Sequence, residues 1–193
     1  MAAGMKTVSH LFASFQLGLA FLSHFDGQRQ KWRIGYEYIT ETGGTHMHPL
    51  NQVLSSDDFG PEPFVVNIAC AAERNPFYRK TLWTGHHLQL TLMSIPPCGE
   101  IGLEVHPEDD QFLRIESGCG IAMMGTNRER LAFQRPVGIG DAIFVPAGIW
   151  HNVMNTGKTP LKLYSIYAPP HHPHGTFHRT KEESDIQGNE NKI

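Results

Sequence analysis

The sequence predicts an all-β fold in which antiparallel strands close into a barrel or jelly roll. Short runs rich in β-branched and aromatic residues recur between residues 64 and 167, with Gly, Pro, Asn or Asp between them. From residue 82 onward, neighbouring runs are too close to hold a crossover helix, which argues against parallel pairing. Hydrophobic residues make up 40% of the 193 residues and charged residues 18%, the balance of a folded domain with a packed core.

Three regions divide the chain. Residues 1–60 show no strong hydrophobic period and are expected to form a partly irregular N-terminal arm. Residues 61–170 are expected to form the barrel, and residues 171–193 a polar tail. The apolar segment 11–22 is too short to span a bilayer and is not followed by a signal-peptide cleavage site, so we expect a short helix or a leader there.

The secondary structure elements follow from local patterns. Residues 69–80 are the one plausible helical insertion, and Asn75-Pro76 breaks it. Strands are expected at 64–68, 82–95, 100–106, 111–115, 120–124, 130–134, 142–145, 151–155 and 161–167. Gly118 and Gly140 mark hairpins, and Asn155 is expected to cap a turn with Gly157 rather than to touch a substrate.

Metal-ligating side chains gather in one segment of the expected barrel. Glu104 and His106 are two residues apart in a strand-like run, so their side chains should leave the same face. Residues 107–110 are typical of a tight turn, and Gln111 then begins the next strand beside His106. Three nitrogen or oxygen donors are therefore expected to converge.

A fourth candidate, His151, lies in a segment that resembles a known family motif. The second motif of the cupin family, G-x5-P-x-G-x2-H-x3-N, is met at all five fixed positions: Gly140, Pro146, Gly148, His151 and Asn155. The first motif, G-x5-H-x-H-x4-E-x6-G, keeps its spacing from Glu104 to Gly118. Glu104 stands where the family has its first histidine, Gln111 stands where it has its glutamate, and the leading glycine, Gly99, is one place off.

The resemblance implies a cupin double-stranded β-helix, a jelly-roll barrel that holds one divalent transition metal ion. The expected ligands are Glu104, His106, Gln111 and His151. Two histidines and one carboxylate suit non-haem iron, while manganese, zinc and nickel stay open. Gln111 could instead bind a metal-bound water.

Other histidines are predicted to be solvated residues, because none has a carboxylate or cysteine partner at ligand spacing. They include His46, His48, His86, His87 and the group 171–174. Phe112, Trp150, Tyr164 and Tyr167 are expected to line a substrate pocket. The cations near the motifs that could receive an anion are Arg114, Arg135 and Lys162.

Three functions stay open. The chain resembles the small cupins grouped with mannose-6-phosphate isomerases, which implies a metal-dependent enzyme on a sugar-like or other small organic substrate, with Glu104 as the catalytic base if it is not a ligand. The alternatives are a non-haem iron dioxygenase and a non-catalytic cupin that binds or senses a small molecule.

Charge and cysteine content bound the partners and the compartment. The formal net charge is -3 and no Lys/Arg block appears, so we expect no nucleic acid partner, and no membrane partner is expected either. Three cysteines without paired spacing fit a reducing cytoplasm. A homodimer is expected, with residues 36–68 as a source of an exchanged strand.

Overall fold

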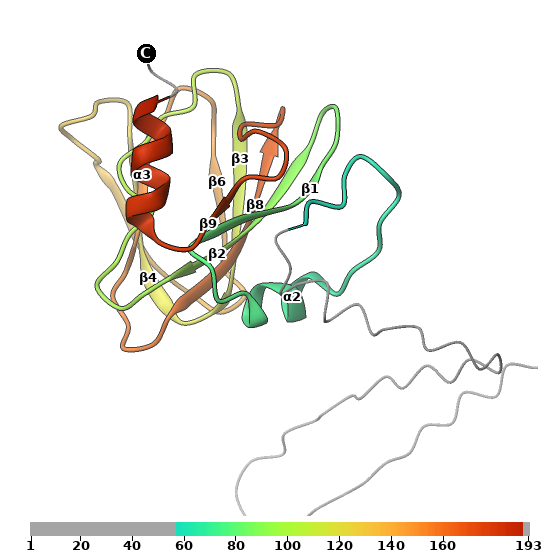
Figure 1. Cartoon of the computed structure of the whole chain (residues 1–193). Helices are drawn as coiled ribbons and strands as arrows, with labels where there is room; N and C mark the ends of the chain where they lie inside the picture. Colours follow the sequence, from blue (N-terminus) through green and yellow to red (C-terminus); the bar gives the residue numbers. More distant parts are fainter. Residues whose placement is uncertain (1–56, 191–193) are drawn as a thin grey trace, which may run out of the picture. The chain divides into compact units, whose positions relative to one another are not determined.

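A computed structural model describes residues 57–190, with side chains through residue 187, and shows two antiparallel sheets facing each other (Figure 1). The elements in chain order are α2 (Ile68–Arg74), β1 (Arg79–Thr84), β2 (Gln89–Ile95), β3 (Asp110–Ser117), β4 (Cys119–Gly125), β5 (Phe133–Gly138), β6 (Ala142–Val145), β7 (Trp150–Asn155), β8 (Leu161–Ala168), β9 (Phe177–His178) and α3 (Lys181–Glu190). The all-β jelly-roll prediction is confirmed.

The strand order shows how the chain alternates between the sheets. The six-stranded sheet has the order β6-β3-β8-β2-β1-β9, and the three-stranded sheet has the order β5-β4-β7. β3 and β4 are consecutive in the chain but lie in different sheets, and Gly118 joins them with a φ of 86°. A Cβ atom there would lie 2.9 Å from the Pro160 carbonyl oxygen, so this turn requires glycine.

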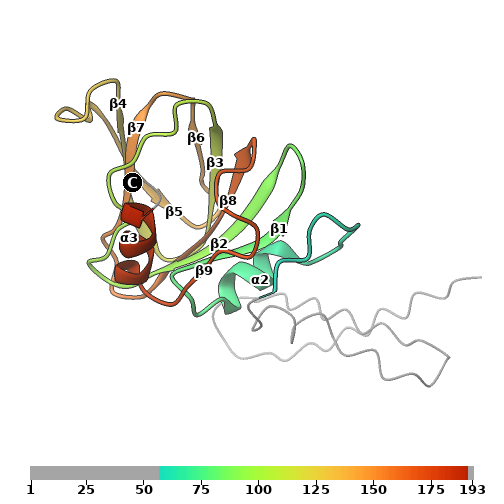
Figure 2. The same cartoon turned by 45° about the horizontal axis from the view of Figure 1, so that its top comes forward.

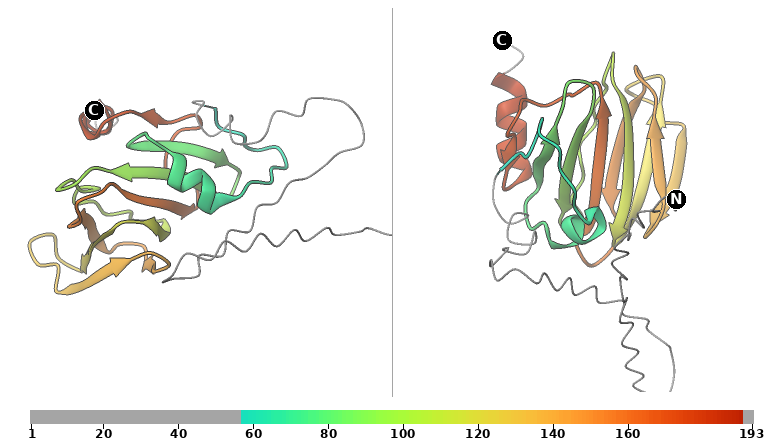
Figure 3. Two further views of the ribbon diagram at one scale, coloured as in Figure 1. Left: turned by 90° about the horizontal axis from the view of Figure 1, so that it is seen from below. Right: turned by 90° about the vertical axis from the view of Figure 1, so that its right-hand side faces the viewer.

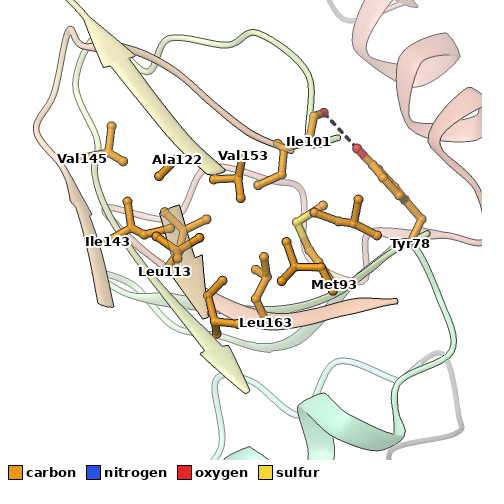
Figure 4. Packing of buried hydrophobic residues seen from close by; sticks show 13 residues of the cluster. Tyr78, Met93, Ile101, Leu113, Ala122, Ile143, Val145, Val153 and Leu163 are labelled. Carbon is orange, nitrogen blue, oxygen red and sulfur yellow. Dashed lines mark hydrogen bonds between the residues drawn. The ribbon is translucent and has the colours of Figure 1, made fainter. Parts of the chain in front are cut away.

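The main core fills the space between the two sheets, as Figure 4 shows. Leu113 and Leu163 point inward from the six-stranded sheet and are fully buried, because every second residue of a strand faces the same side. Ala122 and Val153 meet them from the three-stranded sheet. The Tyr78 hydroxyl closes one end of this core by donating a hydrogen bond to the Ile101 carbonyl oxygen at 2.9 Å.

A second apolar cluster covers the outer face of the six-stranded sheet, where α2 packs (Figure 3). Ala71 and Ala72 of α2 lie against Leu82 and Tyr164. The helix begins where the Asn67 side chain accepts a hydrogen bond from the backbone N–H of Cys70, and it ends before the predicted break at Asn75. The helix and its break are therefore confirmed, but residues 79–80 of the predicted insertion 69–80 belong to β1.

The strand predicted at 64–68 is wrong, although its alternation of side chains is real. Phe64 and Val66 pack onto the second cluster and Val65 is 91% exposed. Residues 64–67 nevertheless belong to no strand, and residue 68 begins α2. An extended segment can bury every second side chain without a partner strand. Alternating burial therefore does not by itself show that a segment is hydrogen-bonded into a sheet.

Other strand boundaries also differ from the prediction. The single run 82–95 is a hairpin of β1 and β2, closed by a hydrogen bond from Gly85 N to Leu88 O at 2.9 Å. Residues 100–106 form isolated bridges with β7 rather than a strand. The strand expected at 130–134 begins later, as β5.

The expected polar tail folds back onto the barrel. β9 pairs with β1, and α3 follows it. His178 on β9 is buried and its Nε2 atom contacts the Gln187 side chain of α3. Among the described residues no helix has the length and apolar character needed to cross a membrane.

Candidate metal centre

Two backbone hydrogen bonds join the chain segments that carry Glu104 and His151. Glu104 N donates to His151 O at 3.0 Å, and His151 N donates to Glu104 O at 2.9 Å. Nearby, Ile101 N donates to Val153 O at 3.0 Å. Residues 99–104 therefore run antiparallel to β7, which brings Glu104 directly opposite His151 although 47 residues separate them in the sequence.

The side chain of Asn152 fastens the same segment. Its Oδ1 accepts a hydrogen bond from Gly102 N at 3.0 Å, and its Nδ2 donates to Glu100 Oε2 at 2.8 Å. Asn155, at the end of β7, donates through Nδ2 to Ile95 O and accepts from Gly157 N through Oδ1, both at 2.9 Å. Its predicted role as a turn cap is confirmed.

The imidazole of His151 is held in one orientation. Its Nδ1 atom lies 3.0 Å from the carbonyl oxygen of Ile149. A carbonyl oxygen only accepts, so Nδ1 carries the proton and the lone pair of a neutral ring is on Nε2. This is the arrangement that positions a metal-ligating histidine.

Gly148 links His106 to the turn before β7. Its N–H donates to the His106 carbonyl oxygen at 2.8 Å, and its φ of 77° lies in the region that favours glycine. The His106 ring then lies 5.2 Å from the His151 ring, between centroids. The two segments of the resemblance therefore meet through backbone contacts on both sides of the histidine pair.

Glu104, His106 and His151 form a cluster that could hold a metal ion. Glu104 Oε1 lies 3.4 Å from His106 Nε2 and 3.3 Å from His151 Nε2, and the three candidate ligand atoms all lie within 4.8 Å of one another. Two ligand atoms at about 2.1 Å from one ion are separated by about 3.0 Å at a right angle and about 3.4 Å at the tetrahedral angle. The two distances from Glu104 Oε1 to the histidine nitrogens match that range.

The environment of these atoms favours an ion. Glu104 Oε1, His106 Nε2 and His151 Nε2 are buried and make no hydrogen bond within the described part of the chain. Buried polar atoms without partners are rare in folded proteins and call for a specific explanation. Burial alone would raise the pKa of the Glu104 carboxyl, but the adjacent His106 and His151 rings and the charge of Arg79 hold that pKa well below its usual range. Glu104 is therefore ionised, as a ligand must be.

Gln111 faces the barrel interior, but it does not lie across a hairpin from His106 as predicted. It lies on β3 between Val145 of β6 and Tyr167 of β8, since residues 100–106 are not the neighbouring strand. The amide is 2% exposed, and its Nε2 donates to Ser165 Oγ at 2.9 Å. Its Oε1 is buried without a hydrogen bond among the described residues, so the oxygen is the free end of this amide. Ligation by Gln111 stays a prediction.

A cavity of about 880 Å³ opens over the cluster. Residues 100–106, Trp150 of β7 and residues 171–178 form its walls together with the first turns of α3. Figure 2 shows α3 beside the yellow-green segment that joins β2 to β3. The candidate metal centre therefore faces a space large enough for a small organic molecule.

Sequence reasoning missed three side chains that contact this site. Arg79 Nη2 lies 3.9 Å from Glu104 Oε2. The His171 ring lies 4.0 Å from the His106 ring, between centroids, and its Nδ1 contacts Asp109 Oδ2. His172 also lines the cavity, and its Nε2 is buried without a hydrogen bond in the described region. The prediction of His172 as a solvated tail residue is wrong, because the chain folds back after β8 and buries its Nε2. His171 is exposed, as predicted, but its ring contacts the site.

The pKa values of both histidines are lowered in this site. Burial and the neighbouring His106 lower the pKa of His171. Burial and the charge of Arg79 hold the pKa of His172 well below its usual range. Asp109, His106 and His171 also form a second group with ligand-like spacing. The one sequence signal for these histidines was that His171 and His172 are adjacent. Adjacency does not indicate which other residues they contact.

The predicted pocket residues divide into two pairs. Trp150 lines the cavity, and the fully buried ring of Tyr167 lies 5.6 Å from the His106 ring, between centroids. Burial raises the pKa of Tyr167 to about 12, so its hydroxyl stays protonated at neutral pH. Phe112 and Tyr164 instead belong to the cluster around α2 on the outer face of the sheet. The prediction that Phe112 and Tyr164 line the pocket is wrong. Side chains alternate between the two faces of a strand, and on β3 and β8 the inward positions are taken by Gln111 and Tyr167.

The three predicted anion-binding cations also lie elsewhere. Arg114 is paired with Glu116 at 3.4 Å, and Arg135 lies over the Phe133 ring with its Cζ 4.9 Å from the centroid. Lys162 donates to Asn75 O and Ser94 Oγ. The cations that line the cavity are Arg79, Arg128 and Lys181.

Comparisons with known proteins place this geometry in a family. Residues 91–167 match the family model described as Cupin_2, cupin domain. A crystal structure of BH2720 from Bacillus halodurans is 58% identical, covers 67% of this chain and 98% of that chain, and superposes with a TM-score of 0.67.

Two curated proteins are similar in sequence to this chain, but their descriptions state no activity. Uncharacterized protein YrkC of Bacillus subtilis (strain 168) is 52% identical over 161 residues, which are 82% of this chain and 87% of the relative. Uncharacterized protein L612 of Acanthamoeba polyphaga mimivirus is 40% identical over 126 residues, which are 65% of this chain and 77% of the relative. Neither description states an activity, so the chemistry must be argued from the site.

Proposed function

The chain belongs to the cupin family, and on that basis we propose that it is a metal-dependent enzyme acting on a small polar organic substrate. The observation that carries the proposal is the position of Glu104 Oε1, 3.3 and 3.4 Å from the Nε2 atoms of two buried histidines beneath a cavity. One divalent transition metal ion, iron, manganese, zinc or nickel, fits this donor set. When bound, such an ion supplies Lewis-acid polarisation of a substrate oxygen.

The residues around the ion have separate tasks in this proposal. His106, His151 and Glu104 hold the ion, with the amide oxygen of Gln111 as the fourth donor. Ile149 fixes the His151 ring through its carbonyl oxygen. Trp150 and the 171–178 segment enclose the substrate and restrict access of water to the ion.

The alternative role of Glu104 as a free catalytic base is less well supported. Its Oε1 faces both histidines, and its low pKa makes it a weak base. Of the two roles, the geometry favours the ligand.

The reaction class is proposed in two versions. Resemblance to the cupins grouped with mannose-6-phosphate isomerases supports aldose-ketose exchange, and the cations Arg79, Arg128 and Lys181 on the cavity wall are compatible with a sugar phosphate. The set of two histidines and one carboxylate supports an iron dioxygenase, because it leaves adjacent positions for oxygen and substrate. Oxygen uptake by the iron-loaded protein distinguishes the dioxygenase from the isomerase. Binding without turnover would favour the third reading, a sensing cupin.

Elemental analysis of untagged protein tests the metal site. We expect the wild-type chain to retain close to one transition metal ion and the double variant His106→Ala/His151→Ala to retain none, because two of the donors are gone. Glu104→Gln keeps the side-chain volume and should weaken metal affinity at least about tenfold.

A matched control removes two histidines elsewhere. His86 and His87 are both exposed on the β1–β2 hairpin and line neither the cavity nor the cluster. His86→Ala/His87→Ala should therefore retain the wild-type metal content. Equal metal content in the two double variants, with both folded by circular dichroism, would rule out the centre.

The cytoplasmic location stays part of the proposal. Its support is that Cys70, Cys98 and Cys119, the three cysteines of the chain, are all free thiols.

A further inference from the structure

Arg79 is a buried cation on the wall of the cavity. It is the first residue of β1, where it pairs with Met93 of β2 and His178 of β9. The residue is 6% exposed and its side chain lines the cavity. Arginine stays protonated in proteins, so this is a permanent positive charge withdrawn from water.

The guanidinium group of Arg79 has unused hydrogen-bond donors. Its Nη1 donates to Ser184 Oγ of α3 at 3.1 Å. Its Nη2 approaches Glu104 Oε2 to 3.9 Å, which is an ion pair but too long for a hydrogen bond. Its Nε is buried and has no hydrogen-bond partner among the described residues. A planar fork of N–H donors is the arrangement that binds carboxylates in a bidentate manner.

Among the described residues, the carboxylate that forms an ion pair with Arg79 is the one that the metal proposal uses. Glu104 presents Oε1 to His106 and His151 and Oε2 to Arg79. With a divalent ion on Oε1, one negative charge faces three positive charges in a buried site. A buried excess of positive charge is costly unless an anion compensates it.

Neighbouring acidic groups on the cavity wall are engaged elsewhere. Asp185 binds Lys181 Nζ through both carboxylate oxygens at 2.9 Å. Glu100 keeps its negative charge, but Asn152 Nδ2 holds its carboxylate at 2.8 Å, and within the described residues Glu100 forms no ion pair with Arg79. The compensating anion is therefore expected to come from a bound ligand rather than from the described wall.

We propose that Arg79 binds the carboxylate of a small organic acid, and that a neighbouring oxygen atom of the same acid would be a ligand of the metal ion. This inference rests on the proposed function, because it needs the ion on Glu104, His106 and His151. The Glu104 carboxylate lies between the Arg79 guanidinium and the two histidines, so the anchor and the ion would be only one carboxylate group apart. A ligand that reaches both must therefore have its carboxylate and its second oxygen donor close together. Small 2-hydroxy and 2-oxo acids have that spacing. Arg79 would therefore select the substrate class by its carboxylate, while Glu104, His106 and His151 would hold the ion that receives the second oxygen.

Calorimetric titration of manganese-loaded protein with glycolate tests the proposal. Glycolate should bind the wild-type chain at least about tenfold more tightly than it binds Arg79→Gln, because a charge-assisted hydrogen-bond pair is removed. Arg79→Lys keeps the charge but loses the planar fork and should fall between the two. Glycolamide, the neutral counterpart of glycolate, should bind weakly and should not distinguish the variants.

Two controls separate anion binding from a structural role. Ser184→Ala removes the α3 partner of Nη1 but leaves the guanidinium group, so glycolate affinity should change less than about threefold. Arg114→Gln removes an arginine on the outer face, which is paired with Glu116, and should not change it at all.

The outcomes also separate the two proposals. Metal content near one ion per chain in every variant, with glycolate affinity unchanged in Arg79→Gln, overturns the anchor and leaves the metal centre standing. Equal losses in Ser184→Ala and Arg79→Gln would mean that Arg79 acts only by holding α3. Wild-type protein that retains none of iron, manganese, zinc or nickel would overturn the metal centre and the anchor with it.

Discussion

At the residue scale, chemistry is concentrated on a single carboxylate. Glu104 contacts His106, His151 and Arg79, so it lies at the junction between the candidate metal and the candidate anion anchor. Its exchange for the histidine of the family motif is what brings a negative charge to this point. Together with Gln111 in place of the family's glutamate, this exchange leaves two imidazoles and one carboxylate in the donor set.

Gly148 shows how one backbone conformation supports that arrangement. A Cβ atom at this position would meet nothing within 4 Å, so the cost of Gly148→Ala comes from its φ of 77° alone. We expect the free energy of unfolding to fall by about 1–2 kcal/mol, measured by urea denaturation.

Gly138→Ala is the matched control for that change. A Cβ atom at Gly138 also meets nothing within 4 Å, and its φ is not positive. Its free energy of unfolding should stay within about 0.5 kcal/mol of the wild type or rise slightly. Equal effects of the two alanines would contradict the conformational argument.

At the element scale, the segments that position the site are largely not strands. Residues 100–106 carry two candidate ligands yet pair with β7 only through isolated bridges. Residues 171–178 wall the cavity between β8 and the two-residue strand β9. Regular strands supply the frame, while the irregular segments between them bring the polar groups together.

The segment before α2 is held in a similar way by Asp58. Its side chain is fully buried and accepts hydrogen bonds from Thr84 Oγ1 at 2.6 Å, Gly60 N at 3.0 Å and Gly175 N at 3.1 Å. It therefore ties residues 58–60 to the end of β1 and to the loop before β9. Burial alone would raise the pKa of Asp58, but these hydrogen bonds outweigh it and lower the pKa below 3.8.

Asp58→Asn should lower the free energy of unfolding by about 1–3 kcal/mol at pH 7, because donors to the carboxylate lose their acceptor. A carboxyl group with a lowered pKa in the folded state stabilises the fold above its unfolded pKa of 3.8, and the stabilisation is lost as the pH falls through the folded value. The difference between wild type and variant should therefore shrink in acid. Urea denaturation from pH 7 to pH 3 measures it.

The exposed carboxylate Glu62 provides the comparison for that series. Glu62→Gln should stay within about 0.5 kcal/mol of the wild type throughout. A deficit of Asp58→Asn that keeps its full size down to pH 3 would argue against an ionised, hydrogen-bonded Asp58.

At the scale of the whole molecule, closure of two sheets decides where the site lies. β3, β7 and β8 approach from different sheets, and the inward position of Tyr167 on β8 places its ring beside His106, with Gln111 opposite Tyr167 on β3. The same closure buries the main core next to the polar cluster. The rigid core on one side and the α3 wall on the other thus define the cavity.

The homodimer stays a prediction at this scale. Light scattering on the full chain should give about twice the monomer mass of 21.6 kDa, with the mass unchanged on dilution to working concentrations. The segment 36–68, expected to supply an exchanged strand, lies mostly outside the described residues. A mass of 21.6 kDa at all concentrations would contradict the prediction.

The sequence by itself determined the all-β class, the break of α2 at Asn75-Pro76, and the candidate ligands Glu104, His106 and His151. These depend on alternation, local turn chemistry and motif spacing, which are written in neighbouring residues. The tertiary structure alone decided that Phe112 and Tyr164 face α2, that Arg79 rather than Arg114 lines the cavity, and that His171 and His172 return to the cavity. The reason is physical: a strand pattern fixes which side chains share a face, but sheet closure and the fold-back after β8 choose which face becomes the interior.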